Sequence, residues 1–236
     1  MTALKTSFSI GLILITLFLS AGEPDVKVQN FPQVQIGDQI WMSQNLDATH
    51  FRNGDEIPQA TNALDWRWAN MNKEPAWCYY KFNESNGEKY QKMYNWYAVN
   101  DPRGLAPEGW HIPSMEEFDI LVDHLGGEIE GGEKLKSTTG WKSFGKWASP
   151  GTNESGFNGT PNGIAEGDGT FQSKGKYGHW WSSTLDEVTE WDIKHNQPQR
   201  AYLFILKYHN GGCGEGSAHR GSFFLDDGMG VRCVKD

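Results

Sequence analysis

The sequence predicts an α+β fold with short antiparallel sheets, about two helices and long glycine-rich loops. Its 11 Trp, 12 Phe and 8 Tyr, together with 28 Gly, are typical of short strands and tight turns packed around bulky rings. A clear helical pattern lies in the middle of the chain, and strand-like runs separated by glycine-rich loops follow it. Because helix and strands occupy separate stretches, antiparallel pairing is favoured.

The helix is predicted over residues 114–125. Ser114 and Glu117 have the S-x-x-E spacing that lets each side chain bond a free backbone amide of the first turn. Gly126 and Gly127 end the element. A second, short helix is expected around the aromatic cluster of residues 94–97. The apolar residues that recur at helical intervals in the first helix are Met115, Phe118, Leu121, Val122 and Leu125.

The strands are predicted from apolar and aromatic runs bounded by turn residues. Residues 34–46 indicate a hairpin with a two-residue turn at Gly37 and Asp38. Trp66 and Trp68, two positions apart, are expected on the same side of an extended strand. Further strands are expected at WCYYKF (77–82), HWWSST (179–184), VTEWDI (188–193), AYLFILKY (201–208) and GVRCVKD (230–236).

The N-terminus predicts export. Lys5, the apolar run 8–21 and the small residues that follow have the layout of a secretory signal peptide at 1–22, with a linker at 23–33. An uncleaved anchor is the alternative. No cysteine lies at or just after Ala21, so the thiol for a bacterial lipid anchor is missing. We therefore expect a protein that is secreted or held at the cell surface or in the periplasm, with membrane contact only through the signal peptide.

The charge of the chain argues against nucleic acid as a partner. The formal net charge is −9, and it becomes −10 when the signal peptide with its one charged residue, Lys5, is removed. No Lys/Arg-rich run interrupts this acidic balance, which repels phosphate backbones.

Seven motifs in order resemble a known family. They are IGDQIWMSQNL, RNGDEIP, AWCYY, YNWYAVNDPRGLAPEGWHIPSMEEFDIL, NESGFNG, GHWWSST and GVRCVKD. Together they are similar to the Fibrobacter succinogenes major paralogous domain, a bacterial secreted or surface domain, over residues 34–236. The resemblance implies a C-type-lectin-like fold, related to the formylglycine-generating enzymes, in which GVRCVKD returns beside the early hairpin. Two loops depart from the family pattern, at 158–163 and 211–227, and are expected to set the ligand.

The three cysteines give no support for the formylglycine-generating chemistry. That chemistry needs reactive cysteines together in one site, whereas Cys213 and Cys233 are far apart in sequence. A disulfide between Cys78 and Cys233 is preferred, with Cys213 left as a spare thiol. A Cys213–Cys233 bond is the competing pairing.

Calcium is the one cofactor that the sequence leaves open. Lectins of the same fold use a proline-bearing loop rich in carboxamide and carboxylate oxygens, and Asn196-Gln197-Pro198-Gln199 is similar to such a loop. Asp226 and Asp227 are the weak metal candidates. Solvated turn residues are the alternative interpretation. No other cofactor is expected.

Three tryptophans are the candidate ligand-binding residues: Trp180, Trp181 and Trp191. Adjacent residues in a strand point to opposite faces, so one of Trp180 and Trp181 is expected to face outward if one face of the sheet is solvated. Exposed indoles are suitable platforms for the apolar faces of sugar rings. The alternative is that both rings are buried under a glycine loop.

No catalytic motif is present. The seven histidines form no H-x-x-x-H or H-E-x-x-H pair, and the chain lacks a G-x-S-x-G elbow and a phosphate-binding glycine loop. We therefore expect a non-catalytic binding or adhesion module that recognises a polysaccharide or a surface protein. Two alternatives stay open: an extracellular hydrolase with dispersed carboxylates, and a structural component of a surface assembly.

Overall fold

The computed structural model describes residues 31–143, 151–209 and 217–236. The predicted signal peptide 1–22, most of the linker 23–33 and Cys213 lie outside the described residues. Residues 31–236 form one unit of the chain. Within the described part, none of the helices has the length and apolar character needed to cross a bilayer.

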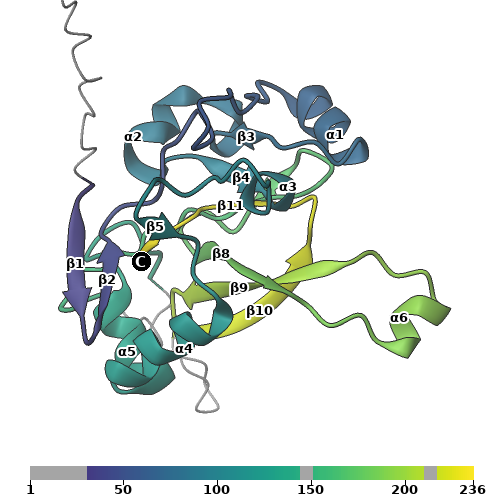
Figure 1. Ribbon diagram of the computed structural model, residues 1–236. Coiled ribbons are helices and arrows are strands. Elements are labelled where there is room, and N and C mark those ends of the chain that lie inside the picture. Colours follow the sequence, from purple (N-terminus) through teal and green to yellow (C-terminus); the bar gives the residue numbers. More distant parts are fainter. Residues whose placement is uncertain (1–30, 144–150, 210–216) are drawn as a thin grey trace, which may run out of the picture. The chain divides into compact units, whose positions relative to one another are not determined.

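Short antiparallel strands form three sheets (Figure 1). The orders are β1-β2-β12-β5, β10-β9-β8 and β3-β4-β11-β6-β7. The bounds are β1 Gln33–Ile36, β2 Gln39–Met42, β3 Trp77–Cys78, β4 Met93–Asn95, β5 Trp110–His111, β6 Ile164–Ala165, β7 Phe171–Gln172, β8 Tyr177–Leu185, β9 Arg200–Lys207, β10 Ala218–Phe224, β11 Gly228–Met229 and β12 Val234–Lys235. The α+β prediction is confirmed.

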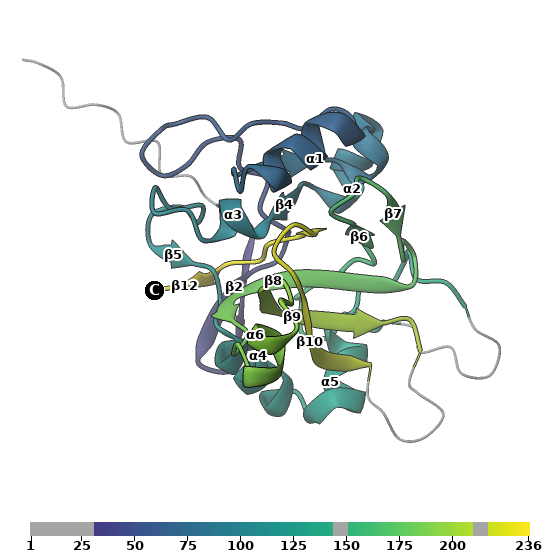
Figure 2. The ribbon, with the colours of Figure 1, turned by 90° about the vertical axis from the view of Figure 1, so that its right-hand side faces the viewer.

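The helices lie on both sides of the β8–β10 sheet. Figures 1 and 2 show α4 and α5 on one side of it, and α1, α2 and α3 with the third sheet on the other. The described part holds more helices than the two expected: α1 Ala63–Met71, α2 Gly87–Tyr90, α3 Trp96–Val99, α4 Met115–His124, α5 Gly127–Leu135 and α6 Glu190–Lys194.

Helix α4 confirms the strongest local prediction. The Ser114 hydroxyl accepts a hydrogen bond from the Glu117 amide at 3.2 Å, and the Glu117 carboxylate accepts one from the Ser114 amide at 2.8 Å. The buried side chains are Met115, Phe118, Leu121 and Val122. Gly126 and Gly127 end α4 with φ of 103° and 86°, a backbone that favours glycine, and the chain then starts α5, which was not expected.

The hairpin and its pairing with the C-terminal segment are also confirmed. Strands β1 and β2 pair in antiparallel register around Gly37 and Asp38. Val234 of β12 pairs with Trp41 of β2, and the Met42 amide donates to the Cys233 carbonyl at 3.0 Å. The end of the chain therefore completes a sheet that its beginning starts.

Two strand predictions are wrong because helix caps outweighed the strand-like patterns. VTEWDI contains most of α6, which begins at Glu190 after the cap residue Thr189, whose hydroxyl accepts from the Asp192 amide. Trp66 and Trp68 lie in α1, where Asn62 accepts from the Leu64 and Asp65 amides. Of WCYYKF only Trp77–Cys78 is strand, and the 3-10 turns Tyr80–Phe82 and Glu84–Asn86 follow.

The expectation that Trp180 or Trp181 faces solvent is wrong. Both side chains are fully buried, because both faces of the β8–β10 sheet are covered. Trp180 belongs to the core cluster under α4 and α5, and Trp181 to the cluster on the other side. Neither ring can serve as a ligand platform, which confirms the buried alternative.

The predicted disulfide is not formed. Cys78 and Cys233 are both free and buried, and they belong to different core clusters. Burial raises the pKa of each thiol, that of Cys233 to about 12. Such thiols act as small apolar core residues.

Asn45, Trp180 and Arg232 form a fully buried polar network. The Asn45 Oδ1 atom accepts from Trp180 Nε1 at 2.7 Å and from Arg232 Nη2 at 2.6 Å. Arg232 also donates to the carbonyls of Met42 at 3.1 Å and of Phe157. Its guanidinium lies 4.3 Å from the Phe157 ring centroid. Because burial disfavours the cation, the pKa of Arg232 falls to about 9.

We predict that Asn45→Ala lowers the free energy of unfolding by about 3 kcal/mol or more, because it leaves donors of a buried cation and of a buried indole without an acceptor. Urea denaturation followed by tryptophan fluorescence measures the change. The control is Gln35→Ala, at an exposed position of β1, which should change stability by less than about 0.5 kcal/mol. Equal stabilities for the two variants would contradict a structural role of the network.

His111 joins the C-terminus to α4. Its Nδ1 lies 2.7 Å from the Asp236 carboxylate and its Nε2 lies 2.8 Å from that of Glu117. Burial by itself lowers the pKa of His111, but the hydrogen bonds and charges of Glu117 and Asp236 outweigh it, so the pKa is raised.

We predict that His111 stabilises the fold most in mildly acidic solution. Because its pKa is higher in the folded state, its contribution is fully present below the usual value of 6.5 and is lost as the pH rises through the raised folded pKa. Urea midpoints measured across this range should fall for the wild type and fall less for His111→Gln. Parallel pH profiles for the two proteins would refute the prediction.

Candidate functional site

Three neighbouring hollows share lining residues, and we call them together the aromatic groove. The first hollow, about 470 Å³, lies beside α1, and the middle one, about 810 Å³, lies beside α3. They share Pro75 as a lining residue. The third, about 170 Å³, shares Pro198 and Gln199 with the middle hollow. Figure 2 shows the domain with α1, α3 and α6 turned toward the viewer.

Helix α1 presents the first hollow because two of its residues are anchored below. Trp66 Nε1 donates to the Glu166 carbonyl at 3.0 Å, and Asn70 Nδ2 donates to the Asp226 carbonyl at 2.8 Å. The opposite side of the helix then faces outward. Trp68 is 60% exposed and Leu64 is 70% exposed, and both line the hollow.

The middle hollow combines aromatic and polar side chains. The buried Asn95 side chain accepts from the Ala98 amide and so starts α3, which carries Trp96 and Tyr97 into the lining. Phe224 lines it from β10. Trp96 is almost completely buried, and its Nε1 has no hydrogen-bond partner in the described residues.

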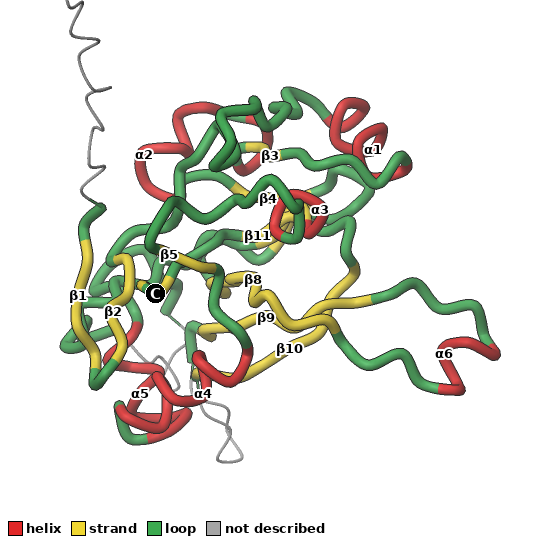
Figure 3. Tube along the Cα trace, in the orientation of Figure 1, coloured by secondary structure: helices red, strands yellow, loops and turns green. Residues whose placement is uncertain are grey.

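The third hollow lies at the base of an arm formed by residues 186–199. Figures 1 and 3 show this segment projecting from the ends of β8 and β9, with α6 at its tip. A hydrogen bond of 3.0 Å from the Asp186 amide to the Arg200 carbonyl closes the base. Trp191 is 58% exposed on α6 and packs in a tilted arrangement against His195 at 4.3 Å between ring centroids, but it lines none of the three hollows.

The two departing loops contribute unequally to the site. The segment 158–163 is largely buried and lines no part of the groove, so its expected role in ligand choice is not supported by its position. The segment 211–227 contains β10, and its end, Phe224 to Asp226, lines the middle hollow.

The carboxylates of the groove differ in how they are bound. Asp101 accepts from Arg103 Nε at 2.8 Å and from Nη2 at 2.9 Å, which lowers the pKa of Asp101. Glu74, Asp226 and Glu187 have no side-chain hydrogen bond or ion pair in the described residues, and each lines a different hollow.

The side chains of the calcium candidates Asp226 and Asp227 lie in different environments. Asp226 lines the middle hollow, whereas Asp227 is buried and accepts from the Gly167 amide at 3.1 Å. Burial, with the charges of Glu166 and Asp226, raises the pKa of Asp227 to about 8. Among the described residues no group of three or more His, Cys, Asp or Glu is arranged to hold a metal ion. A calcium site stays a prediction.

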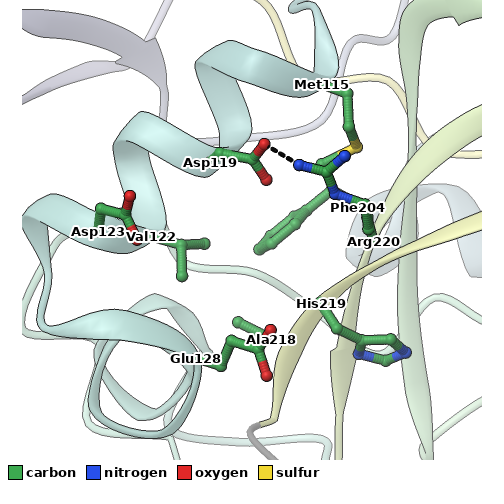
Figure 4. A pocket seen from close by; sticks show the side chains of 9 residues that line it. All are labelled: Met115, Asp119, Val122, Asp123, Glu128, Phe204, Ala218, His219 and Arg220. Atoms are coloured by element: carbon green, nitrogen blue, oxygen red, sulfur yellow. Dashed lines mark hydrogen bonds and ion pairs between the residues drawn. The ribbon is translucent and has the colours of Figure 1, made fainter.

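A separate hollow of about 320 Å³ lies between α4, α5 and β10 (Figure 4). Asp119 and Asp123 of α4 and Glu128 of α5 form its rim, and the Asp119–Arg220 ion pair crosses it. Its aromatic lining residue, Phe204, is buried and belongs to the core under α4. The aromatic groove is larger and has exposed rings, so it is the better candidate site.

A family model, the Fibrobacter succinogenes major domain, matches residues 34–235. The chain belongs to this family. Comparisons with the curated proteins and with the solved structures gave no match. The family description names a domain and no activity.

Three of the seven motifs that carry the resemblance meet in the buried network. SQNL supplies Asn45, HWWSST supplies Trp180 and VRCVKD supplies Arg232, the three members of the buried network. These residues lie in the core. The motif that begins at Tyr94 contributes instead to the lining of the middle hollow, with Trp96, Tyr97, Asn100, Asp101 and Pro102.

Sequence reasoning missed Trp68 and Tyr97 as surface aromatics. The signal for Trp68 was available: Asn62 and Asp65 have the spacing of a helix start, and Leu64, Trp68 and Met71 then share one face. For Tyr97 no such signal exists, because its place in the groove depends on Phe224 and Pro198 from distant parts of the chain.

We predict that Asp227→Asn makes the domain more stable at alkaline pH. The folded pKa of about 8 exceeds the usual value of 3.8, so folding binds a proton and stability falls as the pH rises between these values. Asparagine keeps the acceptor for the Gly167 amide and carries no charge. Urea midpoints of wild type and variant, measured from pH 5 to pH 9, should diverge as the pH rises. A constant difference would show that Asp227 does not titrate in this range.

Proposed function

We propose that this domain is a secreted or cell-surface recognition module that binds an extended polysaccharide in the aromatic groove without chemical turnover. The observation that carries the proposal is the adjacency of the three hollows, which share Pro75, Pro198 and Gln199 as lining residues. A row of neighbouring hollows suits several consecutive units of a polymer better than one small molecule.

The exposed rings support a carbohydrate ligand. Trp68, Tyr97 and Phe224 offer flat apolar surfaces along the groove, and an indole face packs well on the apolar face of a sugar ring. The polar groups beside them include the amides of Asn100 and Gln199, which can both donate to and accept from hydroxyls. This pairing of apolar platform and polar fringe is typical of small-ligand sites.

The state of the carboxylates supports binding without turnover. A glycoside hydrolase needs one acid with a raised pKa and one ionised carboxylate flanking the scissile bond. In the groove, Arg103 lowers the pKa of Asp101. Asp227, whose pKa is raised, does not line the groove and is occupied by the Gly167 amide. A hydrolase with dispersed carboxylates is the alternative that an activity screen tests.

The C-type-lectin-like architecture, inferred from the resemblance, agrees with this location. In such lectins a proline-bearing loop meets the ligand, and here Pro198 and Gln199 line two of the hollows. The proposed recognition needs no cofactor. Calcium bound at Asp226 and Asp227 would supply a further contact to the ligand. Calorimetry with millimolar calcium tests that prediction directly.

We predict that Trp68→Ala weakens polysaccharide binding by about tenfold or more, because it removes the most exposed ring of the groove. The matched control is Met71→Ala, which removes a still more exposed apolar side chain of the same helix that lines none of the three hollows. A glycan array identifies the polymer, affinity measurements compare the variants, and reducing-end release on the same sample reports turnover.

Each outcome of this experiment separates the candidate functions. Binding that is lost in Trp68→Ala and kept in Met71→Ala, without turnover, supports the proposal. Turnover would favour the hydrolase. Equal binding by both variants, or binding lost in Trp191→Ala instead, would place the site elsewhere. Absence of binding to every glycan tested would favour a structural component of a surface assembly.

A further inference from the structure

Carboxylates outnumber cationic side chains in the lining of the aromatic groove. Its three hollows are lined by seven carboxylates and only two cationic side chains, Lys73 and Arg200. Such a surface repels polymers that carry carboxylate, sulfate or phosphate groups and attracts polymers that carry positive charge. The charge of the groove therefore restricts the class of polysaccharide.

One carboxylate in each hollow is available to a ligand. Glu74 lines the first hollow, Asp226 the middle one and Glu187 the third, and none of their carboxylates has a hydrogen bond or ion pair in the described residues. Other groove carboxylates are occupied: Asp65 and Asp192 by helix caps and Asp101 by Arg103. The available charges are thus spread along the groove.

The aromatic side chains reinforce this charge preference. The face of an aromatic ring attracts a cation, and here the Arg200 guanidinium already lies 5.4 Å from the Phe224 ring centroid. Trp68 and Tyr97 offer further rings in hollows that also hold Glu74 and Asp226. An ammonium group near these rings would meet both a carboxylate and an aromatic face.

A second, independent feature calls for an oxygen acceptor. Trp96 lines the middle hollow, is almost completely buried, and has an Nε1 donor without a partner in the described residues. An unsatisfied buried donor is costly, so a ligand oxygen that reaches it gains affinity. Sugar hydroxyl and ring oxygens are suitable acceptors. Ammonium groups and sugar oxygens occur together in amino sugars.

We infer that the polymer recognised by the aromatic groove is a polysaccharide of amino sugars whose amino groups are free and protonated. This inference rests on the proposed function and specifies its ligand. Free ammonium groups engage Glu74, Asp226 and Glu187, the rings pack on the aromatic side chains, and a ligand oxygen accepts from Trp96.

A pair of matched ligands tests the inference. A β-1,4-linked glucosamine oligomer and its fully N-acetylated counterpart have the same linkage and ring, and differ in charge. Calorimetry with the full domain is run at mildly acidic pH, where carboxylates are ionised and the amines are protonated. We expect the glucosamine oligomer to bind about tenfold more tightly, and this preference to fall with added salt.

Variants that each remove one carboxylate show which residues produce the preference for the charged oligomer. Asp226→Asn and Glu74→Gln should each weaken binding of the glucosamine oligomer by about fivefold and leave the N-acetylated oligomer unaffected. Glu108→Gln, which removes an exposed carboxylate outside the groove, is the control and should change neither. The three variants keep the size of the side chain, so circular dichroism should show the native fold.

The outcomes distinguish this inference from the proposed function. Equal binding of the two oligomers, or tighter binding of the N-acetylated one, overturns the amino-sugar inference and leaves a polysaccharide site. If neither oligomer binds but a different glycan binds on the array, the amino-sugar inference is overturned and the proposed polysaccharide site is kept. Binding of oligolysine as tightly as the glucosamine oligomer, with loss in Asp226→Asn, would mean that the groove binds basic peptide and would overturn both proposals.

Discussion

The structure depends on the burial of one guanidinium, that of Arg232. A buried cation without a carboxylate partner is stable only if its N–H donors find neutral acceptors. Arg232 finds them on Asn45, Met42 and Phe157, which come from the first hairpin, the residues just after it, and a loop in the second half of the chain. These segments must therefore meet around the C-terminal residues before the cation can be accommodated.

Buried asparagines extend the same principle to the short strands. Strands of two or three residues leave many backbone groups without ladder partners, and each such group needs another partner when it is buried. Asn95 accepts from the Ala76 and Ala98 amides and donates to the Glu74 carbonyl. Asn162 exchanges two hydrogen bonds with the backbone of His179. In this domain, asparagine side chains thus form the hydrogen bonds to buried backbone groups that longer paired strands form in other proteins.

Local signals in the sequence predicted the elements whose stability is local. The α4 helix was found because Ser114 and Glu117 satisfy the first amides within four residues, and the first hairpin because its turn is two residues long. The α6 helix has the same kind of cap at Thr189 and Asp192, but the apolar and β-branched residues around it were interpreted as a strand. The cap, and not the composition, decided the structure there.

The sequence could not predict which faces of a sheet are covered by segments from distant parts of the chain. Trp180 and Trp181 were expected on a sheet with one solvated face, but α4 and α5 cover one side of β8 and the third sheet covers the other. The Cys78–Cys233 pairing failed for a related reason, because nothing local to either cysteine reveals the core cluster to which it belongs.

The position of Trp68 shows how the fold prepares its candidate site. In a strand, Trp66 and Trp68 would lie on the same side, because they are two positions apart. In a helix, the same spacing places them nearly opposite each other. Since Trp66 is fixed below by its bond to the Glu166 carbonyl, Trp68 is held outward on a helix that Asn70 anchors at a second point. A platform held in this way loses little conformational freedom when a ligand binds, so more of the contact energy is available as affinity.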